Sequence, residues 1–286
     1  MEAVGSDLTL SPHTVALVCA LAASLLACSR GEPPILDLAT TTSVQNSGLL
    51  EDLLPHFAGA RVRVHAAGSG RSLDMLHDGI VDAVISHAPE AEADYLVTHP
   101  DWSYRKIAFN RFVIVGPKSD AARVRDASHA LDALRRIADA PVTFISRGDG
   151  SGTHERERAL WTAAGAMPPP ERYLVSGRSM AITLRHADER QGYTLSDQAT
   201  FWQFEQDLDL TVLLDEDPLL LNTYAVVHPG GNETARLFAD WLSRGDGRER
   251  IGAYRVQGRL AFALWPTGCA DAEPKALPCL DAAGNR

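Results

Sequence analysis

The stretch from residue 35 to residue 68, ILDLATTTSVQNSGLLEDLLPHFAGARVRVHAAG, shows the pattern that decides the fold. It starts with a short apolar run, ILDLATT, continues with a helix-like segment, SGLLEDLLPHFA, and ends with a second apolar run, RVRVHAAG. Short apolar runs bounded by glycine and polar residues are typical of strands, whereas apolar residues three and four apart are typical of amphipathic helices. The stretch therefore predicts a strand, a helix and a strand in α/β layers.

The same alternation continues along the chain. Further strands are expected at VDAVISHA (81–88), KIAFNRFVIVG (106–116), VTFIS (142–146), YLVSG (173–177), GYTLS (192–196), LTVLLD (210–215) and LLLNTYAVVHP (219–229). Helices are expected at residues 71–79, around 127–139, after residue 154, at 179–190 and, as one amphipathic helix, at 233–254. Periodicity alone leaves open one doubly wound sheet or two smaller lobes.

Composition limits the class of partner. The chain has 286 residues, of which 45% are apolar and 22% are charged, so it can bury one large core or two modest ones. The formal net charge of -10 argues against a nucleic acid or an anionic membrane as partner, because such binding needs a basic face. If the protein binds an anion, a local pocket must do so against the field of the whole molecule.

The N-terminus has the sequence pattern of an export signal. Residues 15–27, VALVCALAASLLA, form an uncharged apolar run that is too short to span a bilayer comfortably, and it ends at Cys28. Leu25 to Cys28 resembles a bacterial lipobox, which predicts a lipoprotein signal peptide at 1–27, a lipidated Cys28 and an extracytoplasmic, membrane-anchored protein. Glu2 and Asp7 stand where a signal has basic residues, so a buried N-terminal helix is the alternative.

Cysteine spacing at the other end predicts a disulfide. Cys269 and Cys279 lie ten positions apart in a proline-rich tail, WPTGCADAEPKALPCL. In an exported protein such a pair is most simply a disulfide that closes a short terminal loop. A metal site is the weaker interpretation, because no cluster of His and Cys at ligand spacing surrounds the pair.

Several expected helices begin with small hydroxyl residues and glycine. The four segments are TTTSVQNSG (40–48), AGSGRS (67–72), RGDGSGT (147–153) and SGRSM (176–180). A helix N-terminus leaves backbone N–H groups free and binds anions readily, although each segment alone is more typical of an ordinary helix cap. Arg147 favours an anion site, because a guanidinium matches two oxygens of a tetrahedral anion. Asp149 is either its anchor or a turn residue.

Catalytic motifs are weak in this chain. Ser151 lacks the G-x-S-x-G frame of a nucleophile turn, and His154 beside Glu155 is more typical of a solvated residue than of a base. Neither an H-E-x-x-H motif, a phosphate-binding loop nor a dinucleotide fingerprint is present. The sequence therefore predicts hydrogen-bond donors without a nucleophile and base, which favours a binding protein over an enzyme, with no cofactor.

A set of segments in a fixed order resembles a known family. The segments are TTTS (40–43), SGLL (47–50), HAPEAE (87–92), FVIVGPKSD (112–120), SRGDGSGTH (146–154), YTLSD (193–197) and DPLLLNTYAV (217–226). Together they resemble the tungstate-binding proteins of bacterial ABC importers, and the likeness extends from about residue 36 to residue 254.

The resemblance implies a type II periplasmic binding protein fold, in which two α/β lobes joined by a two-strand hinge close on a tetrahedral oxyanion. On this pattern lobe 1 takes residues 35–114 and 222–265, and lobe 2 takes 115–221. FVIVG and NTYAV become the hinge, and 266–286 form a C-terminal tail.

The resemblance also implies a ligand-binding set drawn from both lobes. Its members are Thr41, Thr42, Ser43, Ser69, Arg147, Ser151, Gly152, Thr153, Ser179 and Met180. The family usually has an arginine after the acid of YTLSD, where this chain has Gln198, so the network around Asp197 is expected to differ.

The expected function is capture of tungstate by a monomeric substrate-binding protein, for delivery to a membrane permease and its ATPase. Tungstate and molybdate are unprotonated dianions that suit a site made of donors, whereas hydrogen phosphate brings a proton that needs an acceptor. Binding of molybdate, phosphate or sulfate is the alternative. An anion-sensing regulatory module and a hydrolase that uses Ser151 are further alternatives, although no helix-turn-helix pattern accompanies the former.

Overall fold

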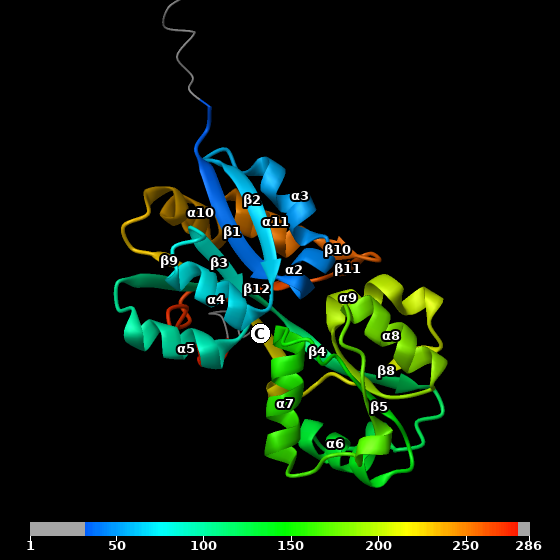
Figure 1. Cartoon of the computed structure of the whole chain (residues 1–286). Helices are drawn as coiled ribbons and strands as arrows, with labels where there is room; N and C mark the ends of the chain where they lie inside the picture. The colour runs from blue at the N-terminus through cyan, green and yellow to red at the C-terminus, as the bar shows by residue number, and fades with distance from the viewer. Residues whose placement is uncertain (1–31, 280–286) are drawn as a thin grey trace, which may run out of the picture. The chain divides into compact units, whose positions relative to one another are not determined.

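The computed structural model describes residues 32–279, apart from the side chains of Ser43 and Asn46. The predicted signal peptide and Cys28 lie outside the described residues. A compact unit begins at Ile35. Its strands are β1 (Ile35–Thr41), β2 (Arg61–Ala67), β3 (Ala83–Ser86), β4 (Trp102–Pro117), β5 (Phe144–Ser146), β6 (Tyr173–Val175), β7 (Thr194–Asp197), β8 (Leu210–Leu214), β9 (Leu221–Pro229), β10 (Arg255–Val256), β11 (Arg259–Leu260) and β12 (Ala263–Leu264) (Figure 1). Its helices are α2 (Thr42–Asn46), α3 (Leu49–Leu53), α4 (Ser69–His77), α5 (Pro89–Thr98), α6 (Ala130–Asp139), α7 (Gly152–Ala164), α8 (Met180–Glu189), α9 (Gln198–Phe204), α10 (Glu233–Arg244) and α11 (Asp246–Ala253).

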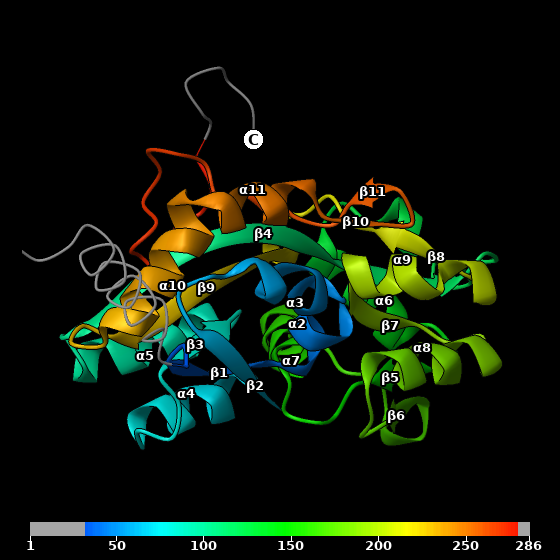
Figure 2. The ribbon, with the colours of Figure 1, turned by 90° about the horizontal axis from the view of Figure 1, so that it is seen from above.

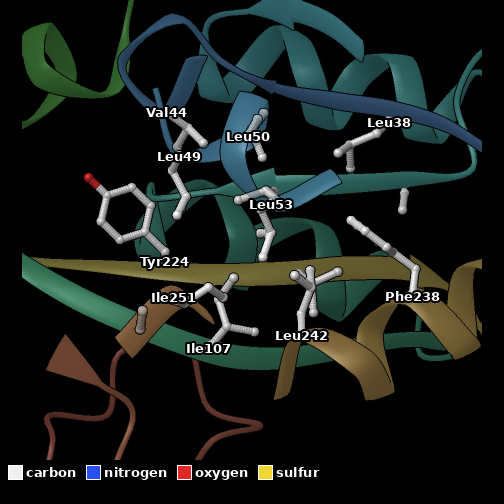
Figure 3. Packing of buried hydrophobic residues seen from close by; sticks show 14 of the residues in the cluster. Leu38, Val44, Leu49, Leu50, Leu53, Ile107, Tyr224, Phe238, Leu242 and Ile251 are labelled. Carbon is white, nitrogen blue, oxygen red and sulfur yellow. The ribbon is translucent and has the colours of Figure 1, made fainter. Parts of the chain in front are cut away.

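The first half of the unit is a mixed sheet in the order β12-β4-β9-β3-β1-β2. β1 pairs in parallel with β2 and β3, while β9 pairs antiparallel with β3 and β4. Leu50 and Leu53 of α3 pack with Leu242 of α10 and Ile107 of β4 in one hydrophobic core (Figure 3). This alternation of strands and helices confirms the predicted α/β class.

The second half is built on the remainder of β4. Its last residues pair antiparallel with β7 and β8, and β5 pairs in parallel with β6. Successive side chains of a strand point to opposite faces, so Phe112 and Ile114 pack in one core with α6 and α7, while Val113 and Val115 pack in another with α8. The apolar run of β4 is therefore buried on both faces here.

One strand, β4, is shared by the two halves. β4 pairs with β9 as far as the register pairs Asn110↔Asn222 and Arg111↔Leu221, and beyond these pairs it continues with β7 and β8. Figure 2 shows β4 running from the half that contains α10 toward the half that contains α6. None of the helices within residues 32–279 is long and apolar enough to cross a bilayer.

Some predicted helix bounds were wrong. The helix expected at 233–254 is two helices that meet at Gly245, where the backbone is extended and the N–H donates to the carbonyl oxygens of Asp240 and Trp241. The helix expected at 47–58 ends at Leu53 and continues as a 3-10 turn that contains Pro55, which lacks the N–H for an α-helical bond. The helix expected from residue 127 begins at Ala130, because His129 caps it. α5 and α9 were not predicted.

The C-terminal tail packs on β4. Cys269 and Cys279 form a disulfide with their Cα atoms 5.6 Å apart. The backbone N–H of Lys106 in β4 donates to the carbonyl oxygen of Asp271 over 2.7 Å, and the Lys106 ammonium lies 4.3 Å from the ring centroid of Trp265. The tail is therefore anchored to the strand that both halves share.

Candidate anion-binding site

Arg147 is held rigidly at the end of β5. Its side chain is 1% exposed, although arginine is usually a surface residue. Nε donates to Asp149 Oδ2 over 2.9 Å and to the carbonyl oxygen of Arg178 over 2.8 Å, and Nη2 lies 2.9 Å from the same Asp149 oxygen. These bonds fix the plane of the guanidinium.

The loop between Arg147 and α7 is shaped by glycine and by Asp149. Gly148 and Gly150 have φ values of 65° and 72°, in the left-handed region that favours glycine. Asp149 Oδ1 accepts from the N–H of Ser151, and His154 Nδ1 accepts from the N–H of Gly150. Asp149 is therefore both the anchor of the arginine and a turn residue, and His154 closes the turn.

The N-termini of α4 and α7 face each other across the two halves. Arg147 Nη2 donates to Thr42 Oγ1 over 3.1 Å. A Cβ added to Gly68, directly before α4, would lie 2.6 Å from the carbonyl oxygen of Gly150, directly before α7. The structure thus brings together the β1–α2 turn, the Gly68–Ser69 turn and the Arg147 loop, which are three of the four segments named from the sequence.

Three polar atoms at this meeting point have no partner among residues 32–279. They are Ser69 Oγ, Ser151 Oγ and Arg147 Nη1, and all three are buried. A buried polar group left without a hydrogen bond costs about 1–3 kcal/mol, more if charged. Three such atoms beside the N-termini of two helices fit an oxyanion, because each can donate to oxygen.

The other predicted site residues lie at the same three turns or beside them. Thr41 is fully buried, and its Oγ1 accepts from the N–H of Val44. Gly152 and Thr153 are the buried first residues of α7. Ser179 is half-buried before α8, next to the Arg178 carbonyl that contacts Arg147. The Met180 side chain packs in the core with Val113, so only its backbone is available to a ligand. Ser43 lies in α2.

Two buried acids support the site, Glu157 and the Asp197 of the YTLSD segment, and only Asp197 was named from the sequence. Glu157 Oε2 accepts from the N–H of Arg147 over 3.2 Å, and its Oε1 accepts from the Tyr173 hydroxyl over 2.6 Å. Asp197 caps α9 by accepting from the N–H of Thr200, beside the half-buried Gln198. Burial raises the pKa of both Glu157 and Asp197. Spacing alone did not reveal Glu157, because it takes part through tertiary contacts.

His87 was also missed as a separate site residue. It follows β3 directly and is buried, and its ring stacks on Tyr224 with the centroids 5.3 Å apart. Burial lowers the pKa of His87 to about 4, so the ring is neutral at neutral pH. Its only sequence signal was its place at the start of the HAPEAE segment.

The geometry does not assemble a serine nucleophile. Ser151 Oγ has no hydrogen bond to a histidine or to any other residue in the described part of the chain, and His154 Nδ1 is occupied by a backbone N–H. A catalytic serine needs a base within hydrogen-bond reach. Within residues 32–279 there is likewise no group of three His, Cys, Asp or Glu side chains that could hold a metal ion.

Comparison with known proteins agrees with this geometry. The family model described as PBP superfamily domain matches residues 29–245. A curated relative, the tungstate-binding protein TupA of Peptoclostridium acidaminophilum, is 37% identical over 229 residues, which cover 76% of this chain and 80% of that protein. The chain belongs to the PBP superfamily, in the family of the tungstate-binding proteins.

Solved structures show the same family fold. The tungstate-binding protein TupA of Desulfovibrio alaskensis matches with a TM-score of 0.71 and 32% identity, over 81% of this chain and 98% of that one. The tungstate ABC transporter protein of Geobacter sulfurreducens matches with a TM-score of 0.67 and 36% identity, over 77% and 98%. The fold is that of a type II periplasmic binding protein, as the sequence resemblance implied.

Proposed function

We propose that this protein is the extracytoplasmic substrate-binding protein of an ABC importer, and that it captures tungstate and delivers it to a membrane permease with its ATPase. The observation that carries the proposal is the junction of Arg147 with Thr42, where Ser69 Oγ, Ser151 Oγ and Arg147 Nη1 are buried without partners in the described chain. The names of the relatives support tungstate as the anion.

The charges around the junction favour a dianion without a proton. Asp149 is already engaged by the Arg147 guanidinium and by the N–H of Ser151, and Asp197 caps α9. Both Asp149 oxygens therefore already accept hydrogen bonds from the protein. Among residues 32–279, the donors Ser69 Oγ, Ser151 Oγ and Arg147 Nη1 outnumber the one buried carboxylate oxygen without a partner, Asp197 Oδ2. Molybdate has the charge and shape of tungstate and is the second candidate ligand.

Ligand binding is expected to stabilise a closed form. On this proposal lobe 1 comprises residues 35–114 and 222–265, lobe 2 comprises 115–221, and the ligand-binding set named from the sequence contacts the anion from both lobes. An anion that bridges the lobes shifts the equilibrium by its difference in affinity for the closed and open forms. A permease that recognises the closed form would then accept only the loaded protein.

Anchoring is a further part of the proposal. Cleavage before Cys28 and lipidation of its thiol would hold a monomer at the outer face of a membrane. A mass measurement of the membrane-extracted protein tests this directly, because acylation adds a mass that a plain cleaved chain lacks. An unmodified Cys28 would refute the anchor and leave the anion site untouched.

The decisive test is oxyanion titration of a soluble form that begins after Cys28. Isothermal titration calorimetry with tungstate, molybdate, hydrogen phosphate and sulfate is expected to show saturable binding of tungstate and displacement only by molybdate. Equal or stronger binding of hydrogen phosphate or sulfate would overturn the assignment.

A further inference from the structure

His87 presents one ring nitrogen to the start of α7. Its Nε2 is buried and has no hydrogen-bond partner within residues 32–279. A Cβ added to Gly152 would lie 2.5 Å from both Nε2 and Cε1 of His87, so the imidazole edge lies against the bare Cα of this glycine. His87 thus reaches from the end of β3 to the helix N-terminus that contains Ser151 and Thr153.

The other ring nitrogen belongs to a chain of buried amides. His87 Nδ1 lies 2.9 Å from Asn222 Oδ1, and Asn222 Nδ2 lies 2.8 Å from Asn110 Oδ1 and 2.7 Å from the Tyr224 hydroxyl. Asn110 and Asn222 are register partners on β4 and β9, close to the point where β4 continues into the second half. The protonation of the ring is therefore tied to the orientation of two amides.

These two amides have two orientations of equal shape, since exchange of amide oxygen and nitrogen leaves the outline of the side chain unchanged. In the orientation shown, His87 Nδ1 donates to Asn222, and Asn110 Nδ2 is buried without a partner in the described structure. With both amides reversed, Asn110 Nδ2 donates to Asn222 Oδ1 and Asn222 Nδ2 donates to His87 Nδ1. The reversal moves the buried donor that lacks a partner in the described chain from Asn110 Nδ2 to His87 Nε2, which lies against the first residue of α7. An oxyanion bound there can accept from Nε2–H, so ligand binding favours the reversed orientation. The hydrogen of the neutral ring then resides on Nε2.

We propose that His87 is a specificity-determining residue of the anion site, where its Nε2–H donates to the bound oxyanion and selects a fully deprotonated dianion over one that carries a proton. This inference rests on the proposed function. A proton-bearing oxyanion would need an acceptor at this position, and an Nε2–H cannot accept. A lone pair on Nε2 would instead repel the oxygens of a dianion.

Charged groups of both signs surround His87, and burial is the main cause of its lowered pKa and neutral ring. Arg147 and Arg156 both disfavour a positive charge on His87. A cavity of about 280 Å³ adjoins the ring, and its lining includes the acids Glu90 and Asp94 from α5 and Glu155 from α7. Tyr224 of β9 stacks on the ring without an ion pair to it. The neutral Nε2–H of His87 adds no charge to the site. It therefore distinguishes oxyanions by whether they carry a proton, and not by their net charge.

The test compares His87→Asp and His87→Phe with the wild-type soluble protein, by calorimetry with sodium tungstate and with sodium phosphate at neutral pH. His87→Phe keeps an aromatic ring and removes the donor, so tungstate affinity is expected to fall about 10- to 100-fold. His87→Asp replaces the donor with an acceptor. Its tungstate affinity is expected to fall at least as far, while its affinity for hydrogen phosphate rises above that of the wild type.

Opposite changes for two anions cannot come from misfolding, which would weaken both. His77→Asp, at an exposed position on α4, is the matched control and is expected to leave both affinities unchanged. An unchanged ratio of tungstate to phosphate affinity in His87→Asp would overturn the inference. Failure of the wild-type protein to bind tungstate would instead overturn the proposed function.

A second measurement observes the tautomer itself. In protein labelled with ¹⁵N-histidine, Nε2 of His87 is expected to have the chemical shift of a protonated ring nitrogen when tungstate is bound. A bare Nε2 in the tungstate complex would refute the proposed donor.

Discussion

Arg147 Nη2 and Thr42 Oγ1 are 3.1 Å apart, although 105 residues separate them along the chain. Arg147 follows β5 in one half of the molecule, and Thr42 follows β1 in the other. The bond therefore joins the two halves directly, while Arg147 Nη1 has no partner among residues 32–279 and can donate to a further group.

Replacing Arg147 with Ala is expected to weaken tungstate binding by about 2–5 kcal/mol, as for the loss of one partner of a desolvated ion pair. Isothermal titration calorimetry measures the loss directly. Arg255→Ala, which removes an exposed arginine on β10, is the control and is expected to bind like the wild type. Unchanged affinity in Arg147→Ala would refute its place in the site.

The close approach of Gly68 to Gly150 predicts that a side chain at residue 68 would clash with the loop before α7. Gly68→Ala places a methyl group 2.6 Å from a backbone oxygen of the other half, so the halves cannot close fully. Tungstate affinity is expected to fall at least about tenfold, or about 1.4 kcal/mol, while each half keeps its core.

Gly70→Ala is the matched control for that substitution. Its methyl group would meet its nearest neighbour, Glu155 Oε1, at an ordinary 3.7 Å. Near-normal binding in Gly70→Ala, together with weak binding and unchanged thermal stability in Gly68→Ala, would support a closure contact. Equal binding by both variants would exclude it.

Burial of His87 predicts a pH dependence of stability. Its pKa is about 4 in the folded protein, against 6.5 for an ordinary histidine, so between these values the unfolded chain binds the additional proton. The stabilisation is complete above pH 6.5 and is lost as the pH falls toward 4, by about 3 kcal/mol in total. Urea unfolding across this range is expected to show a shallower pH dependence for His87→Gln than for the wild type. Parallel curves would contradict a neutral buried ring.

The terminal disulfide predicts a redox effect on stability. A cross-link between Cys269 and Cys279 closes a loop of about ten residues, which by loop entropy stabilises a fold by about 2–3 kcal/mol. Dithiothreitol is expected to lower the melting temperature of the wild type to that of the Cys269→Ser, Cys279→Ser double variant. The double variant should not respond to the reductant. A wild type insensitive to reductant would show that the cross-link adds no stability.

Much of the fold could be predicted from local patterns in the sequence. The strands of 35–41 and 61–67, and the hydroxyl-rich helix starts at Ser69 and Ser151, are visible because strand periodicity and capping are properties of neighbouring residues. The break at Gly245 was not visible, because glycine is tolerated inside many helices and its extended backbone here depends on packing against Trp241.

The site was only partly predictable for the same reason. Arg147 and Thr42 could be named from their segments, but their direct bond needed the three-dimensional arrangement. The contact of His87 with Gly152 and the support of Arg147 by Glu157 join residues from different elements, and no spacing rule connects them. Whether a charged or aromatic side chain is buried depends on the tertiary structure. Only the structure therefore distinguishes these residues from ordinary surface residues.

The single strand β4 has a consequence for cooperativity. Its pairing register is irregular between Lys106 and Ala108 and again between Ile114 and Val115, so each half sets its own alignment on the same backbone. Neither half can unfold without withdrawing a strand from the sheet of the other. Denaturation is therefore expected to proceed as one all-or-none transition, whichever half is destabilised first.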